Sequence, residues 1–261
     1  MNRTLATAGI LVLAACSDAT NPGNSSPLLE TLDVATVAGD AAAEYVSLMR
    51  TQAGAFGGLT SDATRTGAWR QDCTYSSITG RFACPDNTRG GITLSRSFAL
   101  LDAQGQPQSA FDAITTASAN FVTTISGVVV RENFSATFSR ERNITVSGLA
   151  GNESTHVING IGATSNTRSR HSDDGPERSY AMTETTSIVN VVVPFPHASG
   201  AWPISGTITR QISISRDGEQ GGPRIRSRTA MVTFNGTQFV PIVVGDRSLT
   251  LDLATGKIVR N

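Results

Sequence analysis

The side chains best suited to chemistry in this sequence are charged residues set among apolar ones at alternate positions. Between residues 134 and 146 the even positions are apolar except for two arginines, and the odd positions are almost all Ser, Thr, Glu and Asn. Alternate side chains of an extended strand share one face, so the two arginines are expected within an apolar stripe. Laying the following stretches beside this one as tight hairpins adds further charged residues. The predicted ligand face comprises Arg140, Arg142, Glu184, Arg210, Arg226 and Arg228.

The chemistry expected of such a face is recognition of an anion. A guanidinium group donates two parallel hydrogen bonds to a carboxylate or phosphate, and the aliphatic neighbours suit a hydrocarbon chain. We therefore hypothesise a concave face that binds an amphiphile, with Arg140 and Arg142 opposite Gly162 and Gly160. The alternative is that the arginines extend to solvent at the rim, lie over the glycines, or pair with acids. The candidate partners are Glu184, Glu141, Asp173 and Glu177.

A second chemically specific pattern stands at the amino terminus. Arg3 precedes an apolar run over 5–13, which is too short to span a bilayer because about 20 apolar residues are needed. The run ends in Leu13-Ala14-Ala15-Cys16, which resembles the lipobox of bacterial lipoproteins. The resemblance covers residues 1–16 alone. It implies diacylglyceryl transfer to the Cys16 sulfur, cleavage before that cysteine and acylation of its new amino group. The alternative is an ordinary secretory signal peptide.

The lipoprotein resemblance implies attachment to a membrane of the cell envelope, because two or more acyl chains make a stable anchor. Ser17, rather than aspartate, follows the cysteine, and the sorting rule of the family then favours the outer membrane. Residues 18–27 are rich in Asn, Gly, Ser and Pro and are expected to form a flexible tether. The predicted organisation is a cleaved signal peptide over 1–15, a lipidated cysteine with its tether over 16–30, and one β-rich domain over 31–261.

Cys73 and Cys84 are the two cysteines besides Cys16. Residues 74–83 between them read as two short strands around a Thr-Gly turn. Export implies an oxidising compartment, so the predicted role of the pair is a structural disulfide across a hairpin. A metal site is the alternative, but it needs more ligands than two cysteines, and no histidine lies nearby in the sequence.

Other reactive groups form no recognisable motif. His156, His171 and His197 are far apart, and the acidic stretch over 171–177 reads as a turn rather than a calcium loop. The sequence contains no Gly-x-Ser-x-Gly, Ser-x-x-Lys or His-Glu-x-x-His pattern. Its formal net charge is zero, which gives no indication of nucleic-acid binding. No catalytic residue, metal or cofactor is therefore predicted.

The elements that must position these side chains are mostly strands. Only residues 28–50 show helical spacing of apolar positions. From Cys73 onward, period-two alternation and turn signals recur at hairpin spacing. The Asn235-Gly236 pair is the strongest signal for a tight hairpin turn. Strands are predicted over 92–102, 120–131, 134–147, 155–170, 178–193, 203–216, 222–234, 237–244, 248–253 and 257–260.

The predicted fold class is mainly β. No segment between the strands is long enough for a crossover helix, so we expect a large antiparallel meander. Strands of this length in a meander of this size should curl into a barrel, half-barrel or sandwich, with the helix over 28–50 packed on it.

Three functions are compatible with this fold. The first is a non-enzymatic envelope lipoprotein that binds an apolar or amphiphilic ligand. The second is a structural or interaction lipoprotein that presents a β-surface or edge to another envelope protein. The third, an enzyme, has no motif in its favour. In architecture alone, the first resembles the lipid-handling half-barrels of envelope lipoproteins, and this likeness is one of fold only.

Overall fold

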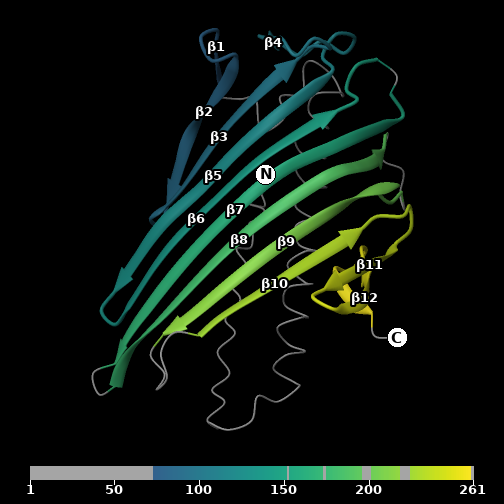
Figure 1. The fold of residues 1–261 in the computed structure, drawn as a ribbon. Helices are drawn as coiled ribbons and strands as arrows, with labels where there is room; N and C mark the ends of the chain where they lie inside the picture. The colour runs from purple at the N-terminus through teal and green to yellow at the C-terminus, as the bar shows by residue number, and fades with distance from the viewer. Residues whose placement is uncertain (1–72, 152, 173–174, 196–200, 218–223, 260–261) are drawn as a thin grey trace, which may run out of the picture.

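The computed structural model describes residues 73–151, 153–172, 175–195, 201–217 and 224–259. Within these ranges the chain forms thirteen strands of one sheet and no helix (Figure 1). The strands are β1 (Thr74–Ser76), β2 (Arg81–Arg89), β3 (Ile92–Leu101), β4 (Pro107–Gln108), β5 (Ser118–Arg131), β6 (Phe134–Ser147), β7 (Thr155–Ser172), β8 (Gly175–Pro194), β9 (Ser205–Asp217), β10 (Arg224–Thr233), β11 (Phe239–Val244), β12 (Arg247–Asp252) and β13 (Lys257–Val259). The signal peptide, the tether and the helix predicted over 28–50 lie outside the described residues.

The sheet is an antiparallel meander. Strands that are consecutive in the chain pair with one another, with one exception. The short β4 pairs only with the last two residues of β3, and β5 is the next strand of the meander after β3. The mainly β, antiparallel prediction is confirmed. The closed barrel is wrong, because no pairing among the described strands joins β13 back to β1.

The predicted strands occur close to their predicted positions, and β6 occupies the predicted range over 134–147. The hairpin predicted at Asn235-Gly236 is present, because β10 pairs with β11 in antiparallel orientation. The predicted two-residue turn is wrong, because residues 234–238 connect the two strands. Asn235 Oδ1 accepts hydrogen bonds from the backbone N–H and hydroxyl of Thr237, at 3.1 and 2.8 Å, and Gly236 N–H donates to the Pro203 carbonyl at 2.8 Å. These contacts hold the loop open.

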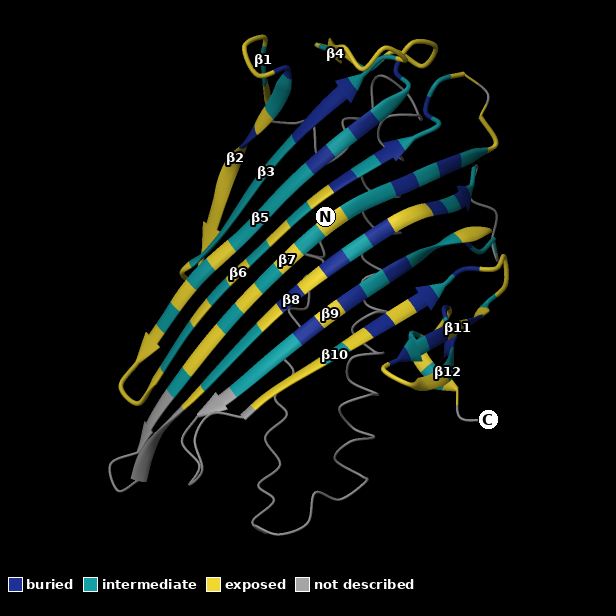
Figure 2. Cartoon of the chain, in the orientation of Figure 1, coloured by how far each residue is buried: buried dark blue, intermediate teal, exposed yellow. Residues whose placement is uncertain are grey.

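One face of the sheet, here called the inner face, bears the buried side chains. On β6 it carries the even-numbered residues, including Ile144 and Val146 at 5% and 3% exposure. Along β5 to β10 the burial is graded: buried residues gather at one end of the strands and exposed ones at the other (Figure 2). The apolar core therefore occupies one half of the inner face. Its largest fully buried members include Leu100, Ile158, Ile208, Val232, Ile242 and Leu251.

A β-bulge lies in β8 next to this core. Between Val189 and Val192 the strand has one residue more than its neighbours, and Asn190 adopts a positive φ of 48°. The side-chain carbonyl of Asn159 accepts a hydrogen bond from Asn190 N–H at 2.8 Å. The extra residue turns Val191 inward, where it is 1% exposed. Because the bulge lies beyond the charged residues of the sheet, it leaves their register intact.

Candidate ligand-binding face

The six predicted ligand-face residues lie on the inner face, in three adjacent rows that cross the strands. In an antiparallel sheet, residues paired across strands share a face. The first row contains Arg96, Thr123, Arg142, Gly162, Thr186, Arg210, Ala230, Val244 and Arg247. The second contains Leu94, Ile125, Arg140, Thr164, Glu184, Ile212 and Arg228, and the third contains Ile92, Gly127, Phe138, Asn166, Met182, Ile214 and Arg226.

The detailed register predicted for the two arginines of β6 is wrong by two residues. Arg142, not Arg140, lies opposite Gly162, while Arg140 lies opposite Thr164. A shift of two residues preserves the face of every side chain, so the predicted set stays together. The Arg142 side chain lies beside the glycine, with its Cγ 3.5 Å from where a Cβ at Gly162 would stand.

Arg210 and Glu184 form a buried ion pair. Arg210 Nε donates to Glu184 Oε1 at 2.8 Å, Nη2 donates to the same oxygen, and the Thr186 hydroxyl donates to it at 3.1 Å. The three side chains are 4%, 6% and 7% exposed. Pairing, the predicted alternative, therefore holds for Arg210. Glu141, another candidate partner, lies on the opposite face and is exposed, and the side chains of Asp173 and Glu177 lie outside the described residues.

The inner face carries a large excess of positive charge in the described strands. Cross-strand pairing places ten of the eleven arginines with described side chains there, Arg81 being the exception. Glu184 is the one acidic residue found on that face among the strand residues with described side chains. We call the central cations the arginine band: Arg96, Arg140, Arg142, Arg210, Arg226, Arg228 and Arg247.

On β3, β5 and β6 the rows that hold the arginine band lie between two apolar regions of the inner face, whereas on β8 Met182 packs against the core. On one side is the packed core, including Phe98, Phe121 and Ile144, all at most 5% exposed. The other side carries apolar residues that are only half-buried. These are Ile92, Leu94, Ile125, Phe138 and Met182, here called the half-buried floor. The packed core has no accessible surface to offer a ligand, so an apolar contact is available only on the floor.

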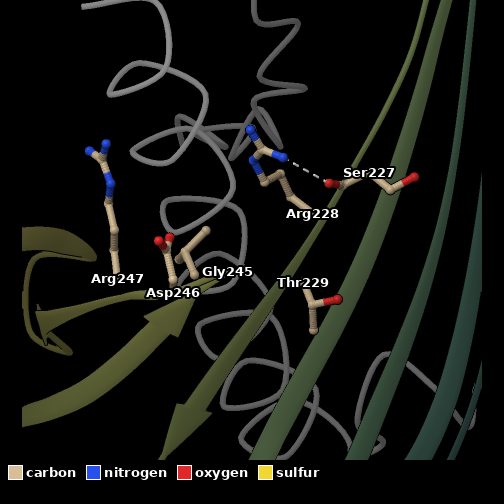
Figure 3. Close-up of a pocket in the computed structure, with 7 residues that line it drawn as sticks. Ser227, Arg228, Thr229, Gly245, Asp246 and Arg247 are labelled. Carbon is tan, nitrogen blue, oxygen red and sulfur yellow. Dashed lines mark hydrogen bonds between the residues drawn. The ribbon is translucent and has the colours of Figure 1, made fainter. Parts of the chain in front are cut away.

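A pocket of about 520 Å³ lies where the arginine band reaches β10 and the β11–β12 turn. Its lining includes Arg228 from β10, Gly245 and Asp246 from the turn, and Arg247 from the start of β12 (Figure 3). Arg228 Nη1 donates to the carbonyl of Ser227 at 3.1 Å. Two guanidinium groups beside a single carboxylate make this pocket suitable for an anionic group.

Sequence reasoning missed three members of the charged rows. Arg96 stands at the centre of an apolar stripe, Ile92 to Leu100, that has the same alternation as β6, so the signal was present. Arg247 was missed because the strand was predicted to begin one residue later. Thr186, as a threonine in a strand, carried no signal of its role beside Glu184.

The predicted disulfide between Cys73 and Cys84 is confirmed. Pairing of Thr74 with Ala83 places the two cysteines directly opposite one another beyond the end of β1. Cys84 belongs to the buried core of the inner face, and Cys73 packs against it. The bridge therefore fixes the first hairpin to the core and has a structural role.

Of the three histidines, His156 is explained by packing, and the side chains of His171 and His197 lie outside the described residues. His156 is 2% exposed and stacks on Phe195 with ring centroids 4.3 Å apart. The described part of the chain contains no cluster of three or more potential His, Cys, Asp or Glu metal ligands. Within the same residues, no helix has the length and apolar character needed to cross a membrane.

Comparison of the chain with protein-family models, with curated proteins and with solved structures gave no match.

Proposed function

We propose that this protein is a lipid-anchored lipoprotein of the cell envelope, without enzymatic activity, whose inner face binds an amphiphile with an anionic head group. The supporting observation is the position of the arginine band between the packed core and the half-buried floor. One face thus offers cations and accessible apolar surface side by side.

The head group would lie on Arg140 and Arg142. These residues stand two positions apart on β6, so their side chains leave the same face in neighbouring rows. Both are half-buried, and partial burial strengthens a charge-assisted hydrogen bond relative to one in water. On the inner face, the Glu184–Arg210 pair balances the charge of β8 and β9, whereas β6 carries two arginines there.

The hydrocarbon chain would lie on the half-buried floor. Ile125 pairs with Arg140, and Phe138 lies two residues before Arg140 on the same face of β6. A chain that extends from the arginines along the strands therefore passes over apolar side chains. Each methylene group buried there would contribute about 0.8 kcal/mol.

Lipidation at Cys16 and packing of the helix over 28–50 on the inner face complete the proposal. The helix proposal is supported by the place where the described chain begins. Cys73, the first described residue, packs against the inner-face core. Together with the helical spacing of residues 28–50, this favours a second layer on the inner face.

The experiment is a binding titration with the mature polypeptide carrying Cys16→Ser. Oleate and lysophosphatidylglycerol serve as anionic probes and monoolein as an uncharged probe, each below its micelle concentration. The anionic probes should bind more tightly, and Arg140→Ala with Arg142→Ala should weaken them by about a hundredfold, since a hydrogen bond to a charged group contributes about 1.5–3 kcal/mol. Equal binding of charged and uncharged probes contradicts the proposal.

The matched control replaces Arg89 and Arg131 by alanine. Both are exposed and lie at strand ends outside the arginine band, and their loss removes the same net charge. This variant should bind the anionic probes as the parent protein does. An equal loss in both double variants would show that net charge, rather than the site on β6, controls binding.

A protein-interaction role is the second candidate. It is favoured by one specific observation, an open strand edge on β10.

A further inference from the structure

The edge in question is the first half of β10. This strand pairs with β9 along its whole length, from Arg224 to Thr233. On its other side β10 pairs with β11 only over Ala230–Val232. The hydrogen bond nearest the start of β10 on that side runs from Gly245 N–H to the Thr229 carbonyl, at 3.0 Å. Figure 1 shows β11 beside only the far end of β10. Within the described residues, no strand therefore pairs with residues 224–228 on this side.

The alternation of an antiparallel ladder identifies the backbone groups on this open side. Thr229 directs its carbonyl toward β11, so the residues at two-residue intervals before it point the same way. These are Ser227 and Ile225. The Ser227 carbonyl already accepts a bond from its neighbour Arg228. Ile225 is 70% exposed on the outer face, so the edge also presents an apolar side chain.

Other free edges of the sheet carry features that discourage pairing. The edge of β2 contains Pro85 and a register shift between Cys84 and Asn87. β13 has only three residues. Proline, irregularity and short length all protect strand edges. The open half of β10 is regular and has no proline.

The charges beside this edge indicate which strand would fit. Arg226 and Arg228 lie on the inner side of β10. Arg247 lies where the open edge ends against β11, in the pocket beside the β11–β12 turn (Figure 3). Side chains directly opposite one another across strands favour opposite charge. An incoming strand should therefore carry acidic residues on its inner side and apolar or hydroxyl residues opposite Ile225, Ser227 and Thr229.

We propose that residues 224–229 of β10 bind an extended segment of another protein by β-augmentation, and that this segment alternates acidic with apolar residues. Main-chain hydrogen bonds would supply affinity and the arginines specificity. A second copy of this chain is a poor partner, because two antiparallel β10 edges would bring Arg226 and Arg228 of both copies together on one face.

The test uses the mature polypeptide with Cys16→Ser and an acetylated six-residue peptide of alternating valine and glutamate. The peptide should bind saturably and slow the hydrogen exchange of the Ile225 and Ser227 amides. The same peptide with lysine in place of glutamate should bind at least tenfold more weakly. Equal binding of the two peptides, or unchanged exchange at both amides, overturns the proposal. Protection at these amides without peptide, together with a dimer in sedimentation, overturns it in favour of self-association.

Two variants separate the backbone contribution from the charge contribution. Ser227→Pro removes the edge N–H and should abolish binding, whereas Ser227→Ala keeps it and should bind normally. The double variant Arg226→Glu with Arg228→Glu should bind the lysine peptide more tightly than the glutamate peptide. This reversal tests the proposal even if the Ser227→Pro variant does not fold. Failure of these tests leaves amphiphile binding on β6 unaffected, because the head group is placed on Arg140 and Arg142 and not on Arg226 and Arg228.

Discussion

Arg210 on β9 lies directly opposite Thr186 but donates two hydrogen bonds to Glu184, two residues away on β8. The two residues are diagonal neighbours across β8 and β9, where the arginine band meets the packed core. Removing one partner leaves a buried charge without compensation, which costs about 3–5 kcal/mol. Arg210→Ala should lower the free energy of unfolding by that amount in urea denaturation.

The double variant Glu184→Leu with Arg210→Met should recover most of this loss, because apolar residues of similar volume replace a buried ion pair at little cost. Glu141→Gln, on the exposed outer face, is the control and should change stability by less than about 0.5 kcal/mol. If Arg210→Ala is as mild as this control, the pair does not hold β8 and β9 together.

Gly206 should resist substitution because it lies against the bulge of β8. A Cβ there would stand 2.3 Å from the Asn190 carbonyl oxygen, and the residue has a φ of 103°. Gly206→Ala should cost about 1–3 kcal/mol in thermal or urea unfolding, from strain and the clash together. Gly105, with a φ of 77° and nothing within 4 Å of its added Cβ, is the control. Equal losses at the two glycines would mean that the bulge contact is unimportant.

Asp252 should make stability depend on pH in the acidic range. Hydrogen bonds from the side chains of Gln238 and Thr255 hold the pKa of Asp252 below its usual value. A lowered folded-state pKa stabilises the fold fully above the unfolded-state value of about 3.9, and the stabilisation is lost as the pH falls through the folded-state value. Asp252→Asn should therefore be less stable than the parent near neutral pH and equal to it in strong acid. Urea unfolding across this range tests it, and a pH-independent difference would contradict it.

The proposed lipid anchor at Cys16 predicts a defined change in the mature protein. Cys16→Ala should abolish lipidation, so the chain should stay uncleaved or become soluble, as judged by mass spectrometry and detergent partition. Ser17→Ala is the control and should be processed and lipidated like the parent. A processed Cys16→Ala protein that still partitions with membranes would exclude the lipidated cysteine as the anchor.

The meander order was predictable because the connections between strands are short, and the shared face of the six predicted charged residues was predictable because it depends on period-two alternation. The stripe through Phe138, Arg140 and Ile144 places all its even residues on one side whatever the register. Pairing register is less local. The length of the connection between β6 and β7 decides it, and a difference of two residues moved Arg142, rather than Arg140, to Gly162.

Closure of the sheet and the contacts of Glu184 could not be derived from the sequence. Whether the edge strands meet depends on the accumulated twist of the strands. The loop at Asn235-Gly236 was mispredicted because its conformation depends on Pro203, a residue distant in the sequence. The role of Thr186 beside Glu184 likewise requires the folded geometry.

Location of a bound amphiphile on the inner face is the measurement that tests the central proposal most directly. The mature Cys16→Ser polypeptide, labelled with ¹⁵N, would be titrated with a stearate that carries a nitroxide near its methyl end. Binding on the arginine band predicts broadening of the Ile125 and Phe138 signals and shifts of the Arg140 and Arg142 side-chain N–H signals, with Thr137 and Ser139 on the outer face less affected. Broadening confined to the outer face, or the absence of any saturable shift at Arg140 and Arg142, would contradict the proposal.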